Sequence, residues 1–133
     1  VQSVLPVIEL AAPNLEQRPN AVDLIASNSA TYAFIPGAPV AAPWHDTTTR
    51  PDLDQVAIRL LQENDMLHTE RAGSIMQGQW HALSWLLNEV MGMGYPLRAD
   101  HLLMTGSIGA LHPGKPGNYR AEYESLGSID FTL

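Results

Sequence analysis

The chain has 133 residues with 7 basic and 14 acidic side chains, a net charge of −7 and no cysteine. This length fits one domain that can bury a core, and the lack of cysteine excludes disulfides, thiolate metal sites and cysteine nucleophiles. The acidic balance argues against nucleic-acid binding, and no apolar run of about 18 residues is present that would span a membrane. We therefore expect one globular domain over residues 1–133 with no nucleic-acid or membrane partner. We place it in the cytoplasm, with export after processing as the alternative, because a chain without cysteine fits either compartment.

Short apolar segments separated by turns make up the first half of the chain. The run from Val4 to Ala11 is apolar apart from Glu9, which is typical of a buried strand. β-branched and aromatic side chains recur just before a stretch rich in proline and glycine. In chain order we predict a strand at 4–11, a turn at 12–20, a short helix at 21–28, a strand at 31–35 and a long loop at 36–52.

The second half holds the clearest helix and the most regular strands. Apolar residues at helical spacing from Leu83 to Met91 predict one main helix, and the glycines and proline of residues 92–96 are typical of its end. In chain order we predict a strand at 55–63, a turn at 63–65, a strand at 66–71, a helix at about 79–91, a short buried strand at 101–105 and two strands over 119–124 and 128–133. The expected class is α+β, with one substantial helix packed on a sheet.

Glu9 is the residue whose chemistry stands out. A carboxylate inside an apolar strand costs several kcal/mol if it is buried without a partner. If its side chain points inward, a hard divalent cation such as magnesium is a natural partner. If the strand alternation turns it outward, it is an ordinary solvent-facing carboxylate, and this second alternative is favoured because unpaired carboxylates are rarely buried.

Two further groups are candidates for a site. The five histidines lack zinc-type spacing, and His68 with Glu70 on one strand face offers only two ligands. The predicted strand that ends at Thr105 and Gly106 has hydroxyl and backbone N–H groups of the kind that often line a crevice. A simple turn is an equally good interpretation of this strand end, so a binding role for Thr105 and Gly106 is one of two alternatives.

Several segments occur in an order that resembles one known family. No piece is specific alone, but the ordered set covers nearly the whole chain. The segments are Val4–Glu9, Asp23–Asn28 with Thr31–Ile35, Gly73–Ser74 and Gly78 with Ala82–Asn88, Pro96–Ser107, and Leu126–Phe131. They are similar to the C-terminal half of the fumarylacetoacetate hydrolase superfamily, in its 2-keto-4-pentenoate (2-hydroxypenta-2,4-dienoate) hydratase and 4-oxalocrotonate decarboxylase branch.

The resemblance implies a mixed, twisted β-sheet or roll around a site that holds magnesium or manganese. In the family, three carboxylates bind this ion, which polarises the 2-oxo group of a small 2-keto acid and stabilises an enolate while water adds or a carboxylate leaves. Glu9 resembles one of the three metal ligands, and Asn28, Thr105 and Gly106 resemble residues that contact substrate. The implied protein is a lyase of aromatic catabolism and an oligomer.

The chain also departs from the family pattern. The family's other two metal ligands form a Glu-x-Glu pair on a preceding strand, with a site lysine further upstream, and this chain has neither. Its own Glu-x-Glu, at Glu122 and Glu124, falls in the closing hairpin. Residues 11–13 and Ser27 replace polar or acidic residues of the family, and the usual proline near Gly78 is missing. We therefore expect an N-terminal segment or a second chain of the same protein to complete the site.

Two hypotheses account for this combination. In the first, the chain is the C-terminal part of a hydratase-like or decarboxylase-like enzyme that is active only when an N-terminal segment completes it, since one carboxylate cannot hold magnesium in octahedral geometry. In the second, the chain is a non-catalytic relative that keeps the fold as a binding or structural module. The first is favoured because a carboxylate kept in an apolar strand is costly without a reason.

Overall fold

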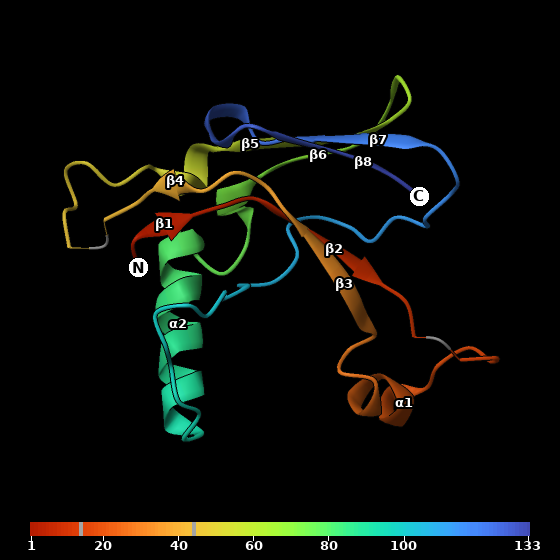
Figure 1. Ribbon diagram of the computed structural model, residues 1–133, viewed down its shortest axis with the longest axis horizontal. Helices are drawn as coiled ribbons and strands as arrows, with labels where there is room; N and C mark the ends of the chain where they lie inside the picture. The colour runs from red at the N-terminus through yellow and green to blue at the C-terminus, as the bar shows by residue number, and fades with distance from the viewer. Residues whose placement is uncertain (14, 44) are drawn as a thin grey trace.

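The computed structural model describes residues 1–13, 15–43 and 45–133. Residue 14, in the predicted turn at 12–20, and residue 44, in the predicted loop at 36–52, lie outside the described residues. Figure 1 shows three parts: a sheet whose strands lie between residues 57 and 132, a two-stranded arm that leads to a short helix, and one long helix. The predicted α+β class with one main helix is confirmed.

The main sheet contains four strands in the order β6-β5-β7-β8. They are β5 (Ala57–Gln62), β6 (Asp65–Arg71), β7 (Asn118–Glu122) and β8 (Ser128–Thr132). Alternation along the sequence sets their two faces, since Tyr119 and Ala121 are buried while Arg120 between them is exposed. The predictions for these four segments are confirmed, and every pairing in this sheet is antiparallel.

The arm is the antiparallel pair of β2 (Val7–Ala11) and β3 (Thr31–Pro36), and the short helix α1 (Ala21–Ala26) lies in the connection between them (Figure 1). Asn20 starts α1, because its side chain accepts hydrogen bonds from the N–H groups of Val22 and Asp23 at 2.8 and 3.0 Å. The Asp23 carboxylate accepts in return from the Asn20 N–H at 3.0 Å. The helix and strand predicted here are confirmed.

The strand predicted at 4–11 is present in two pieces. β1 (Ser3–Val4) pairs with β4 (Val40–Ala41), whereas β2 pairs with β3. The break falls at Pro6, which has no N–H to donate to a continuous ladder. The carbonyl of Pro6 instead accepts from the Gly37 N–H at 2.9 Å, which ties this bend to the start of the predicted loop.

The long helix is α2 (Gln79–Gly92), close to the predicted bounds. Its N-cap, Gly78, has no side chain to cap it, and Asp54 of the 3₁₀ helix η1 (Leu53–Gln55) supplies the carboxylate instead. The other 3₁₀ helices are η2 (Ala72–Ser74) and η3 (Glu124–Leu126). Among the described residues, no helix has the length and apolar character needed to cross a membrane.

Residues 101–105 differ from expectation, because the structure has no strand there and the predicted short buried strand is wrong. Three of the five side chains are exposed and none is fully buried. Within the described ranges, no other backbone forms a ladder with this segment. Apolar composition predicts burial, but a strand also needs a partner, which this segment lacks.

The hydrophobic core lies against the inner face of the main sheet. Ile8 and Ile35 of the arm and Ile108 of the segment after α2 pack against it, so three distant parts of the chain share one core. Full burial of an aliphatic side chain is worth roughly 1.5–3 kcal/mol, and these partly buried isoleucines contribute less than that. The buried members of the core are Val56, Ile58, Ala72, Ala121, Tyr123 and Ile129. This shared core fixes the strand that carries Glu9 beside the main sheet.

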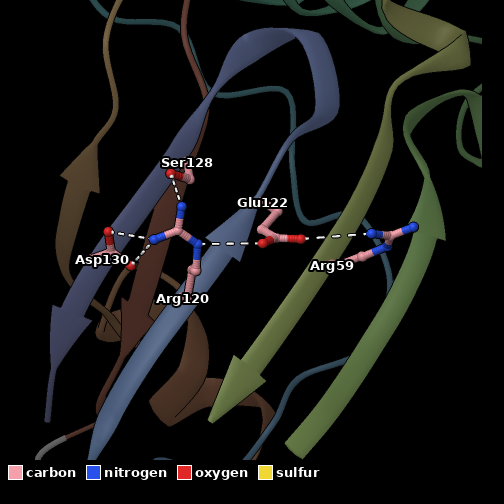
Figure 2. A network of polar contacts seen from close by, with 5 residues as sticks. All are labelled: Arg59, Arg120, Glu122, Ser128 and Asp130. Atoms are coloured by element: carbon pink, nitrogen blue, oxygen red, sulfur yellow. Dashed lines mark hydrogen bonds and ion pairs between the residues drawn. The ribbon is translucent and has the colours of Figure 1, made fainter. Parts of the chain in front are cut away.

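The outer face of the main sheet is polar. Nη1 of Arg120 donates to both carboxylate oxygens of Asp130 at 2.9 Å, and Nη2 donates to Ser128 Oγ at 3.0 Å. Nε of Arg120 lies 3.3 Å from Glu122, whose other oxygen lies 3.8 Å from Arg59 (Figure 2). Because these charges pair with one another on an exposed surface, the opposite face of the sheet is the better candidate for a site.

Candidate functional site

A cavity of about 1000 Å³ lies on the inner side of the main sheet. Its wall includes β1 and β2, inner-face side chains of the main sheet, the start of α2 and much of the segment 97–114. The wall combines many apolar side chains with a few polar ones, which is the usual make-up of a small-molecule site. Its polar residues include Glu9, His68, Gln79, Thr105 and His112.

Glu9 lines this cavity and is exposed. It lies on β2 opposite Phe34 of β3, and its Oε1 accepts a hydrogen bond from Thr31 Oγ1 at 3.0 Å. Of the two alternatives that the sequence left open, the solvent-facing one is therefore observed. The carboxylate does not carry the cost of burial, and its second oxygen is available to a cation or a donor group.

Thr105 and Gly106 also line the cavity. The hydroxyl of Thr105 donates to Gln79 Oε1 at 3.3 Å, and Gln79 Nε2 donates to the carbonyl of Ala72 at 2.6 Å. This contact joins the segment after α2 to the first residue of α2. Sequence reasoning did not single out Gln79, and the only signal for it was the missing family proline beside Gly78.

Asn28 is not among the residues that line the cavity. It is exposed and follows α1 in a turn where Asn28, Ser29 and Ala30 all have positive φ, between 51° and 61°. Asparagine tolerates this left-handed conformation better than most residues, so its place in the turn has a local structural reason. The structure thus brings Glu9, Thr105 and Gly106 to one cavity and leaves Asn28 outside it.

Two histidines from distant parts of the chain meet in the cavity wall. The rings of His68, on β6, and His112, in the segment before β7, have their centroids 5.3 Å apart. The Nε2 atom of each is buried and has no hydrogen-bond partner within the described part of the chain. Glu70, considered with His68 from the sequence, accepts instead from the neighbouring N–H of Arg71 at 2.9 Å.

The oxygen and nitrogen donors of the residues that the structure describes do not by themselves meet the needs of a divalent metal ion. Across residues 1–13, 15–43 and 45–133 there is no group of three or more His, Asp or Glu side chains that could hold such an ion. Magnesium requires near-octahedral oxygen coordination, to which Glu9 contributes one or two atoms. The described residues therefore do not form a magnesium site by themselves.

Curated proteins with sequences similar to this chain include several 2-keto-4-pentenoate hydratases. The chain is 30% identical over 113 residues to a 2-keto-4-pentenoate hydratase of Burkholderia vietnamiensis, covering 84% of this chain and 41% of that protein. It is 24% identical over 131 residues to a 2-keto-4-pentenoate hydratase of Paraburkholderia xenovorans, covering 97% and 47%. The chain thus spans about half the length of the curated relatives it matches. No family model matches it.

Solved structures with the same fold include 4-oxalocrotonate decarboxylase from Pseudomonas putida G7. Its complex with magnesium and adipate superposes with a TM-score of 0.78 at 23% identity, over 97% of this chain and 48% of that one. Its complex with calcium and acetate gives a TM-score of 0.76 over similar shares. In sequence and in fold, the predicted resemblance to the hydratase and decarboxylase branch of the fumarylacetoacetate hydrolase superfamily is confirmed.

Proposed function

We propose that the chain is the C-terminal part of a hydratase-like or decarboxylase-like enzyme acting on a small 2-keto or 2-hydroxy-dienoic acid. The observation that carries this proposal is the cavity whose wall contains Glu9, Thr105 and Gly106. The apolar part of that wall suits the carbon chain of such an acid, and the polar groups suit its oxygens. The similarity to 2-keto-4-pentenoate hydratases supports the same reaction class.

In this proposal a divalent ion, magnesium or manganese, binds Glu9 together with carboxylates from an N-terminal segment or a second chain of the same protein. The chain's match to about half of each relative is consistent with such a division. Because the described residues do not form a metal site alone, we assign them no step that passes through the ion. Their own contribution is to bind and orient the substrate and to exclude water from its carbon chain.

The test uses the full-length protein, with and without added magnesium. The substrates are 2-hydroxypenta-2,4-dienoate and 4-oxalocrotonate, loss of the conjugated acid is followed by ultraviolet absorbance, and NMR separates a hydrated product from a decarboxylated one. We expect magnesium-dependent turnover of at least one acid. Glu9→Gln should lower both turnover and magnesium affinity at least tenfold, as loss of a ligand oxygen and its charge predicts.

Glu16→Gln is the matched control. Glu16 is exposed and is not part of the cavity wall, so the same change of charge there should leave turnover within about twofold. Equal effects of the two substitutions, or turnover that ignores magnesium, would overturn the proposed role of Glu9. The same preparation, examined by light scattering, tests the expected oligomer.

A non-catalytic relative is the second candidate. It is favoured by the absence of a three-ligand group from the described residues and by the apolar residues 11–13 after Glu9. A full-length protein that binds magnesium and adipate but turns over neither acid would support a binding module. Turnover of either acid would exclude it.

A further inference from the structure

We propose that Gln79 is a positioning residue that fixes the direction of the Thr105 hydroxyl. Thr105 then faces the cavity as a hydrogen-bond acceptor, and the position beside it takes a hydroxyl group or a water molecule in preference to a carboxylate oxygen. The orientation of the hydroxyl stands on the geometry alone, whereas its use in selecting a substrate group rests on the proposed function.

The amide of Gln79 has only one orientation that satisfies its neighbours. Its side chain lies between the carbonyl oxygen of Ala72, at 2.6 Å, and the hydroxyl oxygen of Thr105, at 3.3 Å. An amide has donors at the nitrogen and acceptor positions at the oxygen. If the amide were flipped, two acceptor oxygens would meet at the Ala72 carbonyl. The nitrogen therefore faces Ala72, and the oxygen faces Thr105.

The fold holds the backbone of Gln79 and the Ala72 carbonyl, which together set the direction of the amide. The backbone N–H of Gln79 donates to Asp54 Oδ1 at 2.7 Å, which fixes the first residue of α2. Ala72 is a member of the core with 4% of its surface exposed, and its N–H donates to Val56 at 3.0 Å. Because the backbones of Gln79 and Ala72 are both held in place, the direction of the amide is set before any ligand enters the cavity.

The consequence for Thr105 follows from the count of donors. A threonine hydroxyl has one hydrogen and two lone pairs. Its hydrogen is used on Gln79, so only lone pairs remain for a ligand in the cavity. A carboxylate oxygen offers lone pairs as well and is disfavoured there, whereas a hydroxyl or water can donate. In the proposed reaction, such donors are the 2-hydroxyl group of the dienoic acid and the water that is added.

The first arm of the experiment needs no activity. Free energies of unfolding are measured on the full-length protein for Gln79→Met, Thr105→Val and the double variant. Thr105→Val should raise the unfolding equilibrium constant about fivefold, as loss of one hydrogen bond predicts. Gln79→Met should raise it about 25-fold, because it also removes the bond to the Ala72 carbonyl. The double variant should show about the same 25-fold change as Gln79→Met alone, because Thr105→Val then removes a bond that is already lost, rather than the roughly 125-fold change of independent sites.

The second arm measures the affinity for adipate by calorimetry, with magnesium held constant. Gln79→Met frees the Thr105 hydroxyl to donate, so adipate affinity should rise at least threefold. The gain should vanish in the double variant, and Thr105→Ser, which keeps the hydroxyl, should match the wild type. If Gln79→Met does not fold, Gln79→Leu replaces it, since its side chain likewise has no oxygen to accept from the Thr105 hydroxyl.

The outcomes separate this inference from the proposed function. An additive unfolding cycle overturns the positioning role, and adipate affinity that does not rise in the Gln79 variant overturns the acceptor role of Thr105. Failure of the wild type to turn over either acid overturns the proposed function alone, because neither arm of the experiment depends on turnover. A coupled cycle with a threefold gain in adipate affinity supports the inference.

Discussion

The carboxylate of Asp54 accepts a hydrogen bond from the backbone N–H of Gln79 at 2.7 Å and so caps α2 from a separate 3₁₀ helix. The helix has glycine at its own N-cap and no acidic residue in its first turn. The first N–H groups of a helix have no partner within it, and a nearby carboxylate also interacts favourably with the helix dipole. One residue thus holds the helix start that carries Gln79 and, through it, Thr105.

Substitution of Asp54 tests this capping role. We expect Asp54→Ala to lower the free energy of unfolding by about 1 kcal/mol, the usual cost of losing a helix cap. Urea denaturation monitored by circular dichroism measures the change. Asp52→Ala is the control, because Asp52 is exposed and makes no side-chain capping bond. Equal losses in the two variants would show that the charge, and not the cap, is responsible.

Gly78 is constrained by the same carboxylate. Its φ of 108° is rarely adopted by other residues, and a Cβ atom there would collide with the Asp54 side chain. We expect Gly78→Ala to destabilise the protein by more than about 1 kcal/mol, since backbone strain and the collision add. Gly92→Ala, at a helical position with open space around it, should instead be neutral or slightly stabilising. A neutral Gly78→Ala variant would contradict the capping geometry.

Local patterns explain which parts of the fold could be predicted. The strands of the main sheet have side chains that alternate with period two, and α2 has apolar residues at period 3.6, so both are visible in sequence. The segment 101–105 is mainly apolar but has neither of these two periods. Whether it forms a strand depends on a neighbouring backbone, which the local sequence does not reveal. The division of residues 4–11 into two strands also depends on partners, although Pro6 marks the break.

The candidate site was predictable only in part, for a related reason. Glu9 and Thr105 could be proposed from the resemblance, and both line the cavity. Three other residues of the wall, Gln79, His68 and His112, make contacts with residues far away in the sequence. Local residue spacing does not predict such contacts. Asn28 has the expected residue type, but it lies in the turn after α1 and is not among the residues that line the cavity.

Arg120 connects two strands of the main sheet through its contacts with Asp130 and Ser128 (Figure 2). We expect Arg120→Ala to cost about 0.5–1 kcal/mol, because the pairs are solvent-exposed and water screens them. The loss should shrink in high salt, which unfolding in buffers of different ionic strength measures. Arg59→Ala should cost less, since its distance to Glu122 is 3.8 Å and its side chain is 57% exposed. A larger loss for Arg59 would contradict this ranking.

Asp46 accepts three hydrogen bonds from two threonines. The Thr48 hydroxyl, at 2.6 Å, is the main cause that lowers the pKa of Asp46 from 3.8 to about 2, and the Thr49 hydroxyl and Thr48 N–H add to it. Because the folded-state pKa is depressed, the stabilisation is present above pH 4 and is lost as the pH falls towards 2. Thr48→Val should move the pKa of Asp46 back towards 3.8, measured by NMR titration, whereas Thr47→Val should not. An unchanged pKa in the Thr48 variant would exclude this hydrogen bond as the cause.

Tyr123 links the main sheet to the arm, since its hydroxyl donates to the Val7 carbonyl at 3.3 Å. Burial raises the pKa of Tyr123 from 10.0 to about 12. A raised folded-state pKa means that this contribution to stability is fully present below pH 10 and is lost as the pH rises through 12.

Tyr123→Phe isolates that contribution. At neutral pH it should cost about 1 kcal/mol, because the Val7 carbonyl loses its donor. Between pH 10 and 12 the wild type should lose more stability than the variant. Only the wild type has the Tyr123 hydroxyl, which ionises more easily in the unfolded state than in the folded state. Tyr32→Phe is the control, because it removes the same hydroxyl group from a side chain that is 66% exposed. If the wild type and Tyr123→Phe lose stability in parallel over this range, the buried hydroxyl is not the group that couples alkaline pH to unfolding.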